Sequence, residues 1–165
     1  MVRNMYYVNL FFLYSILGHI MESVVYFFYK GESGILFFPW TPIYGLGVVI
    51  IVFCYHLWKD KLQNKILKYF FVFLTGFFLL SLLEWIGGVL IEKIFGYVFW
   101  SYNRLKFHIG HYIALEISFI WAIASMLVIF LLPWTDKIIK KIPRSISWLF
   151  IILFLSDIGM TILFK

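Results

Sequence analysis

The stretch Tyr14-Ser15-Ile16-Leu17-Gly18-His19-Ile20-Met21-Glu22 decides the fold class, because it belongs to a run too apolar for anything but a membrane. Within this run it places a hydroxyl, an imidazole and a carboxylate. The run leads into an aromatic segment, and the chain becomes apolar again at Thr41-Pro42-Ile43-Tyr44-Gly45. Of the 165 residues, 64% are hydrophobic and only 13% are charged, whereas about a quarter are charged in a soluble domain. We therefore predict an all-α polytopic membrane protein, built as a bundle of transmembrane helices. An ionisable group inside such a helix is costly, so Glu22 is a candidate functional residue.

Five runs are apolar and close to the length of about 20 residues that a spanning helix needs. The predicted spans cover residues 8–29, 42–58, 66–91, 112–132 and 146–164, within a single transmembrane domain of residues 1–165. Thr41 suits the N-cap of the second helix and Pro42 its first position. All four prolines are predicted to mark the ends of spans. The first run is expected to be a retained span, because no alanine precedes Ala114 to form a signal cleavage site.

The net charge of +6 lies in short stretches between the apolar runs, which favours membrane loops over a nucleic-acid surface. Lys and Arg on the side of the N-terminus outnumber those on the other side, so we predict a cytoplasmic N-terminus in the cell membrane. The first group is Arg3, Lys59, Lys61, Lys65, Lys68, Lys137, Lys140, Lys141 and Arg144; the second is Lys30, Lys93, Arg104, Lys106 and Lys165.

Two connections on the predicted outer side, residues 31–41 and 92–111, are rich in aromatic and apolar side chains. One interpretation places these rings at the level of the lipid headgroups. The other is that the segments are re-entrant and fold back over the bundle, which requires that protein or a wet cavity surrounds their irregular backbone.

Four carboxylates lie inside the predicted spans at similar depth, about 6–10 Å below the outer end of each helix. They are Glu22, Glu84, Glu116 and Asp157. Apart from Lys68 at the inner end of the third span, no Lys or Arg lies within a span to pair with them. The nearest candidates are His19 and, in the aromatic connection, Arg104, His108 and His111. This layer predicts one shared polar site in the outer half. The alternative is that each acid accepts structural hydrogen bonds from a Trp, a Tyr or loop backbone.

Other chemistry is sparse. His19 lies one turn from Glu22, a spacing that suits a local hydrogen bond better than a metal site, and we predict no metal and no cofactor. The chain has no Gly-x-x-x-x-Gly-Lys-Ser/Thr, no Gly-x-Ser-x-Gly and no His-Glu-x-x-His, so no catalytic residue is assigned and ATP hydrolysis by a P-loop is excluded. The glycines within the spans fit close helix approach.

Several blocks resemble a known family. They are Phe12-Leu13-Tyr14-Ser15-Ile16-Leu17-Gly18 with Glu22, Pro42-Ile43-Tyr44-Gly45, Glu84 with Gly87 or Gly88, Trp100-Ser101-Tyr102-Asn103 and Ser118-Phe119-Ile120-Trp121. Over residues 12–143 the chain is similar to the putative ABC-transporter type IV permeases, the CmpB-type membrane proteins. His19 stands where the family usually has Trp, and Ser101 where it usually has Asp. The resemblance implies a permease and draws attention to Tyr14, Ser15, Gly18, Glu22, Pro42, Tyr44, Gly45, Glu84 and Trp100.

The leading prediction is a permease component without its own ATPase, acting in the lipid bilayer as a homo-oligomer or with a cytoplasmic ATPase chain. Its substrate or ion site would comprise Glu22, Glu84, Glu116, Tyr14, Ser15, Tyr44, Trp100 and Arg104, with Gly18, Pro42 and Gly45 as structural positions. A second hypothesis is a structural or regulatory membrane protein whose carboxylates hold the outer loops. A third is an intramembrane enzyme acting on a lipid-like substrate.

Overall fold

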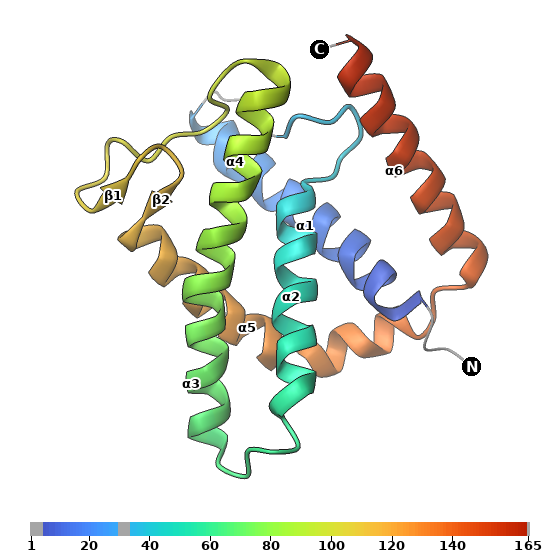
Figure 1. The fold of residues 1–165 in the computed structure, drawn as a ribbon. Coiled ribbons are helices and arrows are strands. Elements are labelled where there is room, and N and C mark those ends of the chain that lie inside the picture. The colour runs from blue at the N-terminus through green and yellow to red at the C-terminus, as the bar shows by residue number, and fades with distance from the viewer. Residues whose placement is uncertain (1–4, 30–33, 165) are drawn as a thin grey trace. The chain divides into compact units, whose positions relative to one another are not determined.

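The computed structural model describes residues 5–29 and 34–164, and the fold is all-α as predicted (Figure 1). The helices are α1 (Tyr6–Tyr29), α2 (Pro42–Trp58), α3 (Lys65–Thr75), the π-helical η2 (Gly76–Leu80), α4 (Ser81–Phe95), α5 (Leu115–Ile139) and α6 (Arg144–Phe164). A short antiparallel pair, β1 (His108–Ile109) and β2 (Ile113–Ala114), lies between α4 and α5 and was not predicted. Arg3, Lys30 and Lys165, which entered the charge count, lie outside the described residues.

Among the described residues, three helices are long and apolar enough to cross a membrane, namely Lys65–Phe95, Leu115–Ile139 and Arg144–Phe164. Helix α2 is apolar but shorter, with 17 residues, and α1 has 24 residues. The membrane character of the chain is therefore confirmed. The count of five spans and the cytoplasmic N-terminus stay predictions.

The chain divides into two compact units. The first contains Met1–Val49 and Pro133–Lys165, and the second contains Ile50–Leu132. Both divisions fall inside helices, α2 and α5. The prediction that every proline marks the end of a span was wrong at Pro133, because α5 continues through it to Ile139. A proline inside a helix removes one backbone hydrogen bond, which helices in membranes can tolerate. One domain over residues 1–165 stays a prediction.

In the first unit, α1 packs against α6 through an aromatic cluster. The ring of Phe12 lies 5.4 Å from Phe150 and 5.7 Å from Phe154, and Trp40 joins both phenylalanines from the connection before α2. Asn9 and Ser147 add a buried hydrogen bond of 2.6 Å between α1 and α6. This packing brings the connection of residues 34–41 onto α1 and α6.

In the second unit, the long helix Lys65–Phe95 packs against α5 at small residues. A Cβ at Gly76 would collide with Ser125, and the hydroxyls of Ser81 and Ser118 form a 2.6 Å hydrogen bond. Gly88 is covered by the ring of Tyr112. Small side chains let helix backbones approach closely, which is the role expected for glycines in the spans.

Candidate functional site: the polar face of α1 and the carboxylates of the two connections

The first candidate is a polar face on α1, formed by Ser15, His19 and Glu22. Their spacing of four and three residues places them on the same side of the helix. Ser15 is fully buried, and His19 and Glu22 are half-buried. Ser15 Oγ and His19 Nδ1 are buried yet make no hydrogen bond within the described part of the chain. Buried polar atoms are nearly always paired, so this face keeps unused hydrogen-bonding capacity.

The segment that precedes and begins α2 lies across this face. The amide of Thr41 donates to the Ser15 carbonyl at 3.0 Å, and the Thr41 hydroxyl donates to Glu22 Oε2 at 3.4 Å. Tyr44 covers Gly18 so closely that a Cβ on this glycine would overlap its ring. Gly45 meets Ser15 and the backbone of α1 in the same way.

Several positions singled out in the sequence are thus brought together in one place, although they come from two separate motifs. They are Ser15, Gly18, Glu22, Tyr44 and Gly45, and Pro42 begins α2 beside them. Tyr14 contacts a different region, because its hydroxyl hydrogen-bonds to Thr135 on α5 at 2.9 Å. The one-turn spacing that suggested a hydrogen bond for His19 places it on the same face as Glu22, but His19 Nδ1 makes no hydrogen bond to any of the residues that the structure describes.

Asp157 on α6 has an entirely structural environment. Its side chain is fully buried and accepts from the amides of Phe37 and Phe38 at 2.9 and 3.0 Å, and from the indole of Trp40 at 2.8 Å. Thr161 adds a longer contact of 3.4 Å. These donors leave the carboxylate well satisfied, and they fasten the connection of residues 34–41 to α6.

Three carboxylates of the second unit hold the connection between α4 and α5. Glu84 is 5% exposed and accepts from the Tyr102 hydroxyl at 2.6 Å. Glu92 accepts from Tyr112 at 2.9 Å, and Glu116 accepts from the amide of Phe107 at 3.3 Å. Sequence reasoning missed Glu92 and Tyr112, because both stand near the ends of helices. Polar residues are common at such positions and therefore do not indicate a site.

Trp100, Arg104 and His111 also belong to this connection. Trp100 packs its ring 5.5 Å from Tyr112, and its indole nitrogen is buried without a hydrogen bond in the described residues. Arg104 is exposed. His111 closes the turn, with its backbone carbonyl accepting from Tyr102 and its Nδ1 lying 2.9 Å from the Asn103 side chain.

The predicted shared layer divides between the two units. Glu22 and Asp157 belong to the first, and Glu84 and Glu116 belong to the second. A single site formed by all four stays a prediction. Each acid does contact one of the two connections that were predicted for the outer side. Within residues 5–29 and 34–164, no three His, Cys, Asp or Glu side chains gather closely enough to hold a metal ion.

Comparison with known proteins identifies the family. Residues 9–163 match the family described as Putative ABC-transporter type IV, which covers nearly the whole chain and extends past the region of resemblance noted in the sequence. Neither the curated proteins nor the solved structures contain a significant match. The chain belongs to the Putative ABC-transporter type IV family.

Proposed function

We propose that this member of the Putative ABC-transporter type IV family is a membrane component of a transporter, without an ATPase of its own, that binds a proton or a monovalent cation at the polar face of α1. The observation that carries the proposal is the environment of Glu22. This half-buried carboxylate accepts hydrogen bonds from the side chains of Tyr44 and Thr41, the latter at 3.4 Å, while Ser15 Oγ and His19 Nδ1 on the same helix face are buried and make no hydrogen bond within the described residues. These groups can still bind a ligand.

The proposal includes an arrangement in the membrane. We assign five spans to α1, α2, the helix Lys65–Phe95, α5 and α6, with the N-terminus in the cytoplasm and the protein in the cell membrane. An ATP-hydrolysing chain, or a second copy of this chain, would complete the transporter. The family name supports the ATPase partner, because an ABC transporter couples its membrane part to ATP hydrolysis.

Proton and cation flux test the site. Proteoliposomes containing the purified chain are given a potassium gradient with valinomycin, and uptake of protons or of sodium, which valinomycin does not carry, is followed. We expect Glu22→Gln to lower the flux at least tenfold with normal membrane insertion, because a neutral amide cannot replace the carboxylate. Glu92→Gln is the control, since Glu92 is an exposed acid outside the polar face. Full flux in Glu22→Gln would refute the site.

The partner is tested separately by purification in mild detergent. We expect an ATP-hydrolysing chain to co-purify and its ATPase rate to depend on this protein. If no such chain is recovered after chemical cross-linking in the native membrane, the proposal of an ABC-type assembly fails, whatever the flux experiment shows.

A second candidate function has an observation in its favour. Asp157, Glu84 and Glu116 each accept hydrogen bonds from a connection, which suits a structural or regulatory membrane protein whose acids hold its loops. That function predicts that Glu→Gln changes at these positions lower the thermal stability in detergent and leave every flux unchanged.

A further inference from the structure

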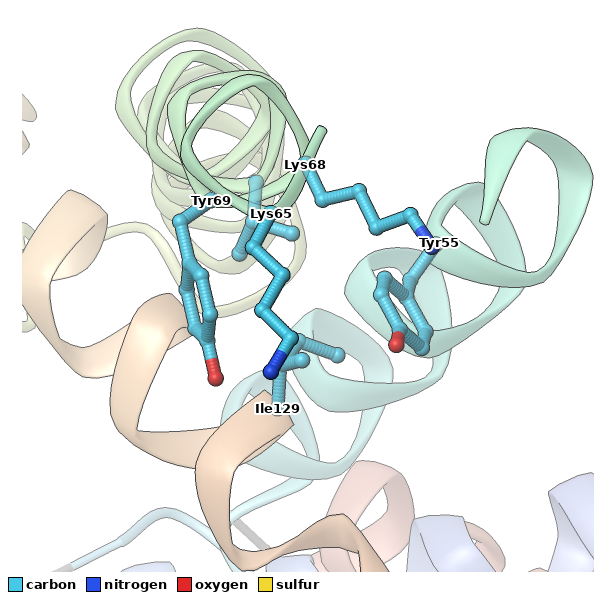
Figure 2. Close-up of a pocket in the computed structure, with 6 residues that line it drawn as sticks. Tyr55, Lys65, Lys68, Tyr69 and Ile129 are labelled. Carbon is cyan, nitrogen blue, oxygen red and sulfur yellow. The ribbon is translucent and has the colours of Figure 1, made fainter. Parts of the chain in front are cut away.

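A small pocket lies in the second unit where α2 ends and α3 begins. Its volume is about 230 Å³. It is lined by Tyr55, Lys65, Lys68, Tyr69, Val72 and Ile129. Figure 2 shows Lys65 and Tyr69 extending from α3 toward Ile129 on α5, with Tyr55 facing them from α2 and Lys68 reaching across to the α2 side. We call the more exposed lining residues, Tyr55, Lys65, Lys68 and Tyr69, the rim of the pocket; they carry two ammonium groups and two phenol hydroxyls. The buried side chains of Val72 and Ile129 form its apolar floor.

The charges around this pocket favour an anion. Asp60 is the one acid between Tyr55 and Tyr69, a stretch that contains Lys59, Lys61, Lys65 and Lys68. Lys ammonium groups bind phosphate as point charges, and tyrosine hydroxyls can donate to the remaining oxygens. An apolar floor below such a rim suits a phosphate that carries an organic substituent.

The location also suits the surface of a bilayer. Lys65 begins a long apolar helix, and Ile66 and Phe70 next to it are exposed. Trp58, at the end of α2, lies beside Phe71 with ring centroids 5.8 Å apart and the ring planes tilted by 48°. Aromatic and basic residues at the end of a spanning helix are typical of the headgroup region, where basic side chains attract anionic lipids.

We propose that this pocket binds a phosphate group, with Lys65 and Lys68 compensating its charge and Tyr55 and Tyr69 donating to its oxygens. The phosphate can come from the headgroup of an anionic lipid or from a soluble phosphate. The site is independent of the polar face of α1, and it adds a regulatory or anchoring ligand to the protein. The phosphate site does not depend on whether the polar face of α1 binds a proton or a cation.

The test compares the full chain, purified in mild detergent, with three double variants. Lys65→Gln/Lys68→Gln removes the charges of the pocket. Lys59→Gln/Lys61→Gln is the matched control, because it removes the same charge from the same connection but no residue that lines the pocket. Tyr55→Phe/Tyr69→Phe removes only the two hydroxyls.

Three probes are added to each protein. Dioleoyl phosphatidylglycerol and dioleoylglycerol are titrated and their retention is measured by native mass spectrometry, and inorganic phosphate is titrated by calorimetry. We expect phosphatidylglycerol to bind the unmodified chain and the control alike, to bind Lys65→Gln/Lys68→Gln at least tenfold more weakly, and to bind the tyrosine variant several-fold more weakly. Dioleoylglycerol, which lacks the phosphate, should bind none of them selectively.

Binding of inorganic phosphate with the same dependence on Lys65 and Lys68 supports the site and identifies a soluble ligand as sufficient. Equal binding of phosphatidylglycerol and phosphate by all the variants overturns the proposal. A comparable loss in the Lys59→Gln/Lys61→Gln control also overturns it, because the effect would then come from the net charge of the connection. Circular dichroism of each variant establishes that the helices are retained.

Discussion

Asp157 and Glu22 are both carboxylates on helices of the first unit, and both contact the connection of residues 34–41. Asp157 is fully buried and accepts two amides and an indole within 3.0 Å. Glu22 is half-buried and accepts from two side chains, Tyr44 and the Thr41 hydroxyl, the latter at 3.4 Å. Two acids with the same sequence signature, a carboxylate in an apolar helix, thus have very different environments.

The difference in hydrogen bonding distinguishes a carboxylate that stabilises the fold from one that is a candidate binding site. A buried carboxylate whose oxygens are all engaged stabilises the fold and has little capacity for another partner. A half-buried carboxylate held by side chains alone, on a helix face whose other polar atoms make no hydrogen bond within the described residues, can change its protonation or bind a cation with less disturbance of the backbone. An acid in a spanning helix is therefore a functional candidate only when its hydrogen bonds leave room for a ligand.

The largest effect is expected from Asp157→Ala. It leaves the amides of Phe37 and Phe38 and the Trp40 indole without an acceptor, and each unsatisfied buried donor costs about 1–3 kcal/mol. We expect the free energy of unfolding in detergent to fall by about 3 kcal/mol or more. Asp157→Asn keeps one acceptor oxygen and should lose less. Tryptophan fluorescence during denaturant unfolding measures both, and a stability equal to that of the unmodified chain would show that Asp157 is not the scaffold acid.

Gly45→Ala tests the close contact that positions the polar face. Its Cβ would collide with Ser15 Oγ and the Phe11 carbonyl, and such overpacking typically costs about 1–3 kcal/mol. Gly159→Ala is the matched control, because a Cβ there meets nothing within 4 Å and alanine favours the helix by up to about 1 kcal/mol. We expect the midpoint temperature of thermal unfolding in detergent to fall for Gly45→Ala and not for Gly159→Ala. Equal midpoints would contradict the close approach of α1 and α2.

Tyr102→Phe extends the comparison to the second unit. It removes the 2.6 Å hydrogen bond to the buried carboxylate of Glu84, and we expect a loss of about 1–2 kcal/mol. Tyr97→Phe, at an exposed tyrosine of the same connection, should change the stability by less than about 0.5 kcal/mol. Denaturant unfolding of the two variants side by side measures the difference. If they match, Glu84 does not depend on the connection.

The smallest structural effect is expected from Glu22→Gln. The amide keeps an oxygen that can accept from Thr41, so the free energy of unfolding should change by less than about 0.5 kcal/mol while proton or cation flux is lost. Stability and flux are measured on the same preparation. A destabilisation as large as that of Asp157→Asn would place Glu22 with the scaffold acids and remove the contrast.

Local pattern predicted most of the helices, because hydropathy and helix capping act over neighbouring residues. The second predicted span, 42–58, coincides with α2, where Pro42 takes the first position, and the fifth, 146–164, differs from α6 by two residues at its start. The fourth was misplaced at both ends. Its start belongs to the turn and strand β2 before Leu115, and its end was set at Leu132, just before Pro133, through which the helix continues.

The sequence by itself determined that this is an α-helical membrane protein, which residues carry unusual polar groups and to which family the chain belongs, since composition, periodicity and motifs lie within short stretches. Only the tertiary structure decided what each carboxylate contacts. The donors to Asp157 stand about 120 residues away in the chain, and those to Glu84 and Glu116 lie in an irregular connection without periodicity. Hydrogen bonds of this kind depend on how the helices pack, and no local pattern encodes that packing.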